Sequence, residues 1–101
     1  MINRINLAKQ FAEKLKSEDI TLIMLYGSVA RRQDTPNSDI DILIVSKNAD
    51  KLRSKVNELA VDVILDCGEV ISPHLMTEEH FNKTKNNMFL SNVLKEGVVL
   101  G

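Results

Sequence analysis

Two apolar runs of strand length in the first half of the chain constrain the fold most. Residues 20–26 read ITLIMLY and residues 39–45 read DIDILIV, and each run is about as long as an average strand. The first run is nearly unbroken, which predicts a strand buried on both faces. In the second run, alternation places Asp39, Asp41 and Leu43 on one face and three isoleucines on the other.

Segments with helical periodicity surround these runs. Residues 5–15 carry apolar side chains at three- and four-residue intervals, which predicts an amphipathic helix. A second helix is predicted over Leu52 to Cys67, where apolar residues again recur every three or four positions and Gly68 is placed to end it. The stretch VDVIL within this segment would fit a strand in isolation, but the longer periodic pattern favours the helix.

The remaining segments complete a single domain over residues 1–101. We expect a short helical segment at 29–33, a turn at 35–37 and a third strand at 69–76, where Pro73 favours an edge position. A last helical region starts after Thr77, is interrupted at Asn86–Asn87 and ends at Gly97, with 98–100 as an extended tail. The predicted fold is α/β or α+β, with a small mixed sheet of about three strands flanked by helices.

Composition excludes several classes of function. Thirteen basic and fourteen acidic side chains among 101 residues give a net charge near −1, so we expect no general affinity for nucleic acids or membranes. A single cysteine, Cys67, excludes an internal disulfide. No apolar run has the length of a membrane span, and the first residues lack a signal-peptide pattern. The expected location is the cytoplasm.

Two short motifs carry the chemistry. Gly27-Ser28 follows the first buried strand, where glycine permits close backbone approach and free N–H groups with a hydroxyl can bind an anion. Asp39 and Asp41 project from one face of the second strand, and at ~5 Å two such charges repel by ~3 kcal/mol at an effective dielectric of 20. A divalent cation such as Mg²⁺ removes that repulsion and binds phosphate oxygens as well.

The segment GSVARRQDTPNSDIDILIV resembles the signature of the DNA polymerase β-type nucleotidyltransferase superfamily, in which Gly-Ser precedes Asp-x-Asp by about ten residues. The resemblance implies that Asp39 and Asp41 are catalytic and hold Mg²⁺. It also implies that Gly27, Ser28, Arg31 and Ser38 contact an NTP, with ATP expected, and that a nucleotidyl group passes to an acceptor hydroxyl. The small size is similar to that of minimal nucleotidyltransferases, which are antitoxins paired with HEPN-domain toxins. A HEPN-domain protein is therefore the expected partner and acceptor.

One departure from the family pattern leaves two alternatives open. Active members usually carry a third acidic residue on the strand after the helix, whereas residues 69–76 offer Ser72 and His74. If VDVILD were that strand instead, Asp62 or Asp66 could supply the third carboxylate. The alternative function is a catalytically weak or inactive nucleotide-binding module that acts as an antitoxin by protein contact. Base preference, acceptor and assembly as a homo- or hetero-oligomer are not determined by the sequence.

Overall fold

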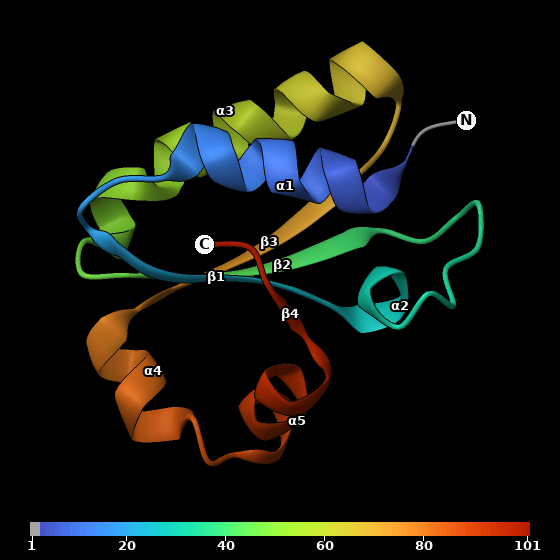
Figure 1. Ribbon diagram of the computed structural model, residues 1–101. Coiled ribbons are helices and arrows are strands. Elements are labelled where there is room, and N and C mark those ends of the chain that lie inside the picture. Colours follow the sequence, from blue (N-terminus) through green and yellow to red (C-terminus); the bar gives the residue numbers. More distant parts are fainter. Residues whose placement is uncertain (1–2) are drawn as a thin grey trace.

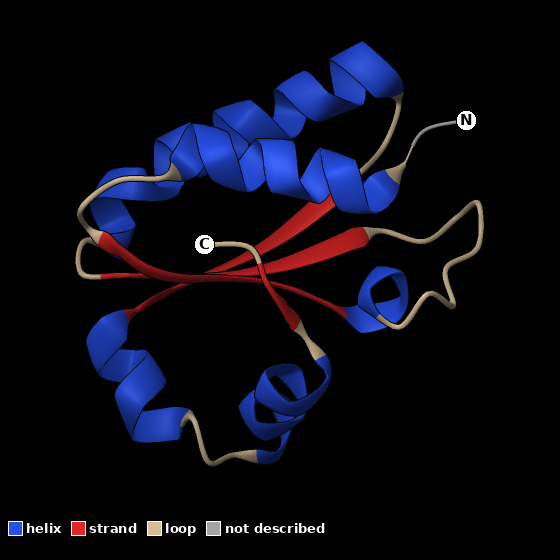
Figure 2. Cartoon of the chain, in the orientation of Figure 1, coloured by secondary structure: helices blue, strands red, loops and turns tan. Residues whose placement is uncertain are grey.

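Helices pack on both faces of one mixed sheet (Figures 1 and 2). The computed structural model describes residues 3–101. Along this part of the chain the elements are α1 (Arg4–Leu15), β1 (Ile20–Tyr26), α2 (Gly27–Ala30), β2 (Ile40–Ser46), α3 (Ala49–Cys67), β3 (Ile71–Thr77), α4 (Glu78–Thr84), α5 (Met88–Glu96) and β4 (Val98–Val99). Every helix in residues 3–101 is too short or too polar to cross a bilayer.

The strand order in the sheet is β3-β2-β1-β4. Strand β1 is antiparallel to both of its neighbours, and β2 is parallel to β3, so α3 forms the crossover between two parallel strands. The mixed sheet and the edge position of the strand containing Pro73 are confirmed. The predicted count of three strands is corrected to four, because the expected tail pairs with β1 through Val98 and Val99.

The two faces of the sheet have separate apolar cores. Helices α1 and α3 cover one face, where the isoleucines of β2 pack with Phe11 and Val56. Helices α4 and α5 cover the other face, where Leu43 and Val45 pack with Leu90 and Val93. Asp41 alternates with Leu43, so its side chain belongs to the α5 side of the sheet. The prediction that the first apolar run is buried on both faces is confirmed for its middle: Ile23 and Leu25 are buried in one core and Met24 in the other, whereas Thr21 is exposed.

Helix α3 decides whether the stretch VDVILD is helical or forms a strand. It runs without interruption through VDVILD and ends at Gly68, whose φ of +71° is the left-handed conformation that glycine adopts most readily. Asp62 and Asp66 are therefore helical and exposed, and α3 lies on the face of the sheet opposite Asp41. The alternative in which one of them supplies the third carboxylate is wrong.

Helix α3 begins three residues before the predicted Leu52, and β3 spans Ile71–Thr77 where 69–76 was predicted. Two further boundary differences lie at the motif residues. The short helix spans Gly27–Ala30 and not 29–33, because the chain turns into it directly at the glycine. Strand β2 begins at Ile40, so Asp39 lies just before the strand, on the loop side. The break at Asn86–Asn87 is confirmed, and the Asn87 side chain caps α5 by accepting a hydrogen bond from the Leu90 N–H at 2.8 Å.

Candidate functional site

The two motifs meet where β1 ends beside the start of β2. Tyr26, the last residue of β1, is paired with Asp41 in the antiparallel register. Gly27 has a φ of +76°, and a β-carbon at this position would collide with Asp41 Oδ2 and lie 3.2 Å from Asp41 Cγ. Glycine is therefore required at position 27 both by backbone conformation and by space. The predicted phosphate turn and a predicted metal ligand are direct neighbours.

The two aspartates occupy different environments. Asp39 is exposed, whereas Asp41 is half-buried in β2. Burial, followed by the negative charge of Asp39, raises the pKa of the Asp41 carboxyl, and the positive charge of Arg31 partly opposes this rise. Burial and then the charge of Asp41 also raise the pKa of the Tyr26 phenol. A carboxylate whose ionisation is disfavoured by burial and by a neighbouring carboxylate is suited to bind a cation.

Two acidic side chains, Asp39 and Asp41, lie where β1 ends beside β2. Within residues 3–101 no group of three or more His, Cys, Asp or Glu side chains is arranged to hold a metal ion. The residue paired with Asp41 on β3 is Ser72, and His74 is paired with Leu43 in the next row. Two carboxylates and a hydroxyl are hard oxygen donors that fit Mg²⁺, with phosphate oxygens and water needed to complete its six ligands.

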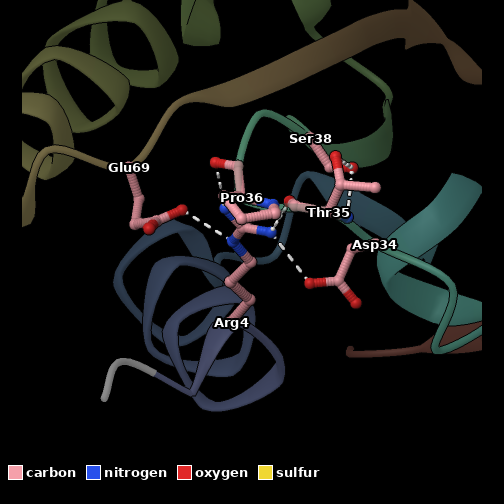
Figure 3. A network of polar contacts seen from close by, with 6 residues as sticks. All are labelled: Arg4, Asp34, Thr35, Pro36, Ser38 and Glu69. Carbon is pink, nitrogen blue, oxygen red and sulfur yellow. Dashed lines mark hydrogen bonds and ion pairs between the residues drawn. The ribbon is translucent and has the colours of Figure 1, made fainter.

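Arg4 fastens the loop that leads to Asp39 (Figure 3). Its guanidinium donates to Glu69 Oε2 at 2.7 Å and to Asp34 Oδ2 at 2.8 Å. It also donates to the backbone carbonyl oxygens of Thr35 at 2.6 Å and Pro36 at 3.0 Å. The hydrogen bond to Glu69, followed by that to Asp34, raises the pKa of Arg4. One side chain from α1 thus joins the segment before β2 to the segment before β3.

Ser38 extends this network of hydrogen bonds to the residue directly before Asp39. Its N–H donates to the Thr35 carbonyl at 3.0 Å, and its hydroxyl accepts a hydrogen bond from the Thr35 N–H at 2.9 Å. The same Thr35 carbonyl accepts from Arg4, so a short chain of hydrogen bonds runs from α1 to the residue before Asp39. The predicted contact of Ser38 with a nucleotide stays a prediction. Sequence analysis missed Arg4, because its partners lie 30 or more residues away.

The opposite side of the site is an open cleft beside α5. This cleft has a volume of about 290 Å³, and residues from the end of β1, α2 and α5 line it: Tyr26, Gly27, Arg31, Phe89, Asn92, Val93 and Glu96. We call it the α5 cleft. Arg31, which the resemblance predicts to contact an NTP, lines the α5 cleft. Its Nη1 is 3.7 Å from Glu96 Oε2. A wider hollow of about 640 Å³ around Arg4 and Glu69 contains none of the predicted site residues.

An aromatic cluster forms the wall between this cleft and the sheet. The ring of Phe89 is stacked on that of His74, with centroids 5.3 Å apart, and meets the ring of Tyr26 edge to face at 5.7 Å. Phe89 therefore bridges β1 and β3 underneath β2, close to the row that contains Asp41. Tyr26 packs in this cluster and also lines the cleft.

Comparison with known proteins identifies the family of the chain. A family model described as "Polymerase beta, Nucleotidyltransferase" matches residues 8–101. A Methanocaldococcus jannaschii protein named "putative protein adenylyltransferase" is 42% identical over 102 residues, which cover 98% of this chain and 99% of that protein. A second protein of that organism and name is 29% identical over 96 residues, covering 88% of this chain and 65% of the relative.

Two solved structures share the fold. One is the crystal structure of a putative nucleotidyltransferase from Sulfolobus solfataricus, with a TM-score of 0.59 and 20% identity, covering 96% of this chain and 81% of that one. The other is a crystal structure of a toxin–antitoxin with AMP-PNP, with a TM-score of 0.62 and 20% identity, covering 99% of this chain and 73% of that one.

Proposed function

Because this chain belongs to the polymerase β nucleotidyltransferase family, we propose that it binds ATP with Mg²⁺ and transfers AMP to a hydroxyl group of an acceptor protein. The acceptor oxygen would form a bond to the α-phosphorus of ATP, and the bond to the leaving pyrophosphate would break. Support for the adenylyl group comes from the name of the 42% identical relative and from the AMP-PNP in the toxin–antitoxin structure.

The contact between Gly27 and Asp41 carries this proposal. A β-carbon at position 27 would occupy the space next to the Asp41 carboxylate, and a phosphate held at the Gly27-Ser28 turn would lie beside the same carboxylate. Phosphoryl transfer depends on such an arrangement, because phosphate oxygens and carboxylates must share a cation.

Each residue of the site has a role in this proposal. Asp39 and Asp41 hold Mg²⁺, which neutralises charge on the phosphates. The Gly27-Ser28 turn and the Ser28 hydroxyl bind phosphate oxygens, and Arg31 adds positive charge at the cleft entrance. Ser38 keeps Asp39 in place through its turn and contacts the nucleotide from there.

The acceptor is proposed to be a partner protein. Nearly the whole described chain is used to build the sheet and the helices that cover it, so recognition of the acceptor would rest largely on the surface of another protein. A toxin–antitoxin structure is among the structural neighbours. A HEPN-domain toxin that this chain adenylylates, with the chain acting as the antitoxin, fits these observations.

A second function is favoured by the residue opposite Asp41. The strand that carries a third carboxylate in active relatives offers Ser72 at this position, and a hydroxyl binds Mg²⁺ more weakly than a carboxylate. The chain would then bind nucleotide and neutralise its partner by contact, with little or no transfer.

Transfer from ATP labelled in either the α- or the γ-phosphate separates these functions. The chain is incubated with Mg²⁺, labelled ATP and the protein that co-purifies with it. Adenylylation leaves the α-label and not the γ-label on the partner and adds the mass of AMP to it. Asp39→Asn is the negative control. Binding of ATP without any labelled partner would favour the second function.

The Gly27-Ser28 turn has its own test. Gly27→Val should weaken Mg·ATP binding more than Ser28→Ala does, since valine strains a positive φ and fills the space beside Asp41. We expect at least ~10-fold weaker binding for the valine variant by calorimetry and a few-fold for the alanine variant. Gly68→Val is the matched control, because Gly68 has a similar φ and open space around it. Equal affinity in Gly27→Val and the parent would exclude a phosphate site here.

A further inference from the structure

One wall of the α5 cleft consists of side chains that phosphate binding does not require. Phe89 is 44% exposed, although its ring contacts Tyr26 and His74. Phe89, Asn92, Val93 and Glu96 follow one another at helical spacing, so α5 presents a single face to the cleft. That face combines an aromatic ring, a buried valine and an exposed side-chain amide.

The position of the cleft relates it to the proposed nucleotide. The cleft shares Gly27 and Arg31 with the phosphate and metal site. On the other side of that site, the loop at 34–36 is tied to Arg4. A nucleotide with its phosphates at Gly27-Ser28 can therefore extend into the α5 cleft. The volume of about 290 Å³ is close to the lower limit of ligand pockets, ~300 Å³, and suits a small planar group.

We infer that the α5 cleft binds the base of the nucleotide, with Phe89 as the stacking surface and Asn92 as the side chain that recognises adenine. Aromatic side chains bind any base through its π face, which provides affinity without selectivity. An amide both donates and accepts, and so pairs with N7 and the N6 amino group of adenine, whereas guanine presents two acceptors at N7 and O6. The inference rests on the proposed function and adds the base preference, adenine over guanine.

The test measures binding of three ligands to the full chain by calorimetry, each with Mg²⁺: ATP, GTP and tripolyphosphate. Tripolyphosphate occupies the phosphate and metal site without a base. In the parent we expect ATP to bind more tightly than GTP, and both to bind more tightly than tripolyphosphate. Asn92→Ala should lower the ratio of ATP to GTP affinity by about fivefold or more and leave tripolyphosphate unchanged.

Phe89 is tested with two variants, because its ring also packs in the aromatic cluster. Phe89→Ala should weaken ATP and GTP binding by about tenfold, with tripolyphosphate unchanged. Phe89→Leu keeps most of the packing volume and should show a smaller loss of the same kind. Met88→Ala and Asn82→Ala change exposed residues outside the cleft and should match the parent for all three ligands.

Several results would overturn the inference. One is an unchanged ratio of ATP to GTP affinity in Asn92→Ala, and another is an equal loss of ATP and tripolyphosphate binding in both Phe89 variants. If the parent binds tripolyphosphate as tightly as ATP, the base makes no contact, and the phosphate site of the proposed function still stands. If the parent binds none of the three ligands, the proposed function fails and this inference fails with it.

Discussion

The two sides of the site are built in opposite ways. On the Asp39 side, one guanidinium and the Ser38 turn hold the loop through hydrogen bonds of 2.6–3.0 Å. On the Asp41 side, the site opens into the α5 cleft, where Arg31 and Glu96 are 3.7 Å apart and both about half exposed. The fastened side holds Asp39, a proposed metal ligand, in place, and the open side leaves room for a nucleotide. A site that binds a flexible triphosphate needs both properties.

Removing either proposed metal ligand, Asp39 or Asp41, should have the largest effect. Asp39→Asn and Asp41→Asn are expected to weaken Mg²⁺-dependent ATP binding by at least ~100-fold, since even changes to groups behind a metal ligand cost 10–100-fold. Calorimetry with and without Mg²⁺ measures this loss, and Asp62→Asn on the exposed surface of α3 should have no effect. Parent-like binding in either variant would show that the carboxylates do not form one metal site.

Breaking the fastened side should reduce stability and also weaken the metal site. Arg4→Ala removes four hydrogen bonds that involve two carboxylates and two carbonyl oxygens. We expect the free energy of unfolding to fall by ~1–3 kcal/mol, whereas Arg53→Ala, which loses only an exposed ion pair at 3.7 Å, should change it by less than ~0.5 kcal/mol. Urea denaturation measures both values.

The Arg4 variants also test how independent the two sides are. Arg4→Ala should weaken Mg·ATP binding because Asp39 is held less firmly, but the ratio of ATP to GTP affinity should stay that of the parent. Arg4→Lys should be intermediate, since an ammonium group cannot replace the forked donors of a guanidinium. A changed base preference in Arg4→Ala would mean that the two sides are coupled.

Adding a carboxylate opposite Asp41 should strengthen the site by a smaller amount. Ser72→Asp places a third acidic side chain in the row of Asp41, and we expect Mg²⁺ affinity to rise by about 3–10-fold. His74→Asp is the matched control, because position 74 lies in the next row and its ring is stacked on Phe89. A rise in His74→Asp and not in Ser72→Asp would place the metal one row further along the sheet.

The smallest expected effect is on the stability of the metal-free protein. Because the pKa of Asp41 is raised in the folded state, its ionisation disfavours folding, and Asp41→Asn should be more stable than the parent in EDTA at pH 7. We expect only ~0.5–1 kcal/mol, since solvent reaches this carboxylate and screens the repulsion. The advantage should vanish below the unfolded pKa of ~3.9 and grow as the pH rises through the raised folded value. Asp66→Asn, at an exposed site, should show no such dependence.

Features encoded by local pattern could be predicted from the sequence. The helix over Leu52–Cys67 has a period maintained across four turns, and Gly68 ends it in the left-handed conformation. That the Gly27-Ser28 turn and Asp41 serve one site was predicted from the motif, and the antiparallel register of β1 and β2 places them side by side. In each case the residues that determine the structure are close in sequence or belong to one continuous pattern.

Features that depend on distant partners could not be predicted. Strand β4 has two residues, too few to show a period, and it forms because β1 offers a free edge. Nothing near Arg4 indicates that its partners lie 30 to 65 residues away. The contacts of Phe89 with Tyr26 and His74 join three elements, and no pattern within any one of them indicates that these rings meet.

Arg4 is the first residue of α1, so the loop at 34–36 is held by a side chain at the end of a helix. Helix ends open locally more readily than helix centres, and here the first turn is closed by the Asn3 cap, which accepts from the Asn6 N–H at 3.1 Å. When that turn opens, the guanidinium leaves Asp34 and Thr35 as well. The amides of Leu7 and Ser38, 31 positions apart in the sequence, should therefore exchange with solvent as one cooperative unit.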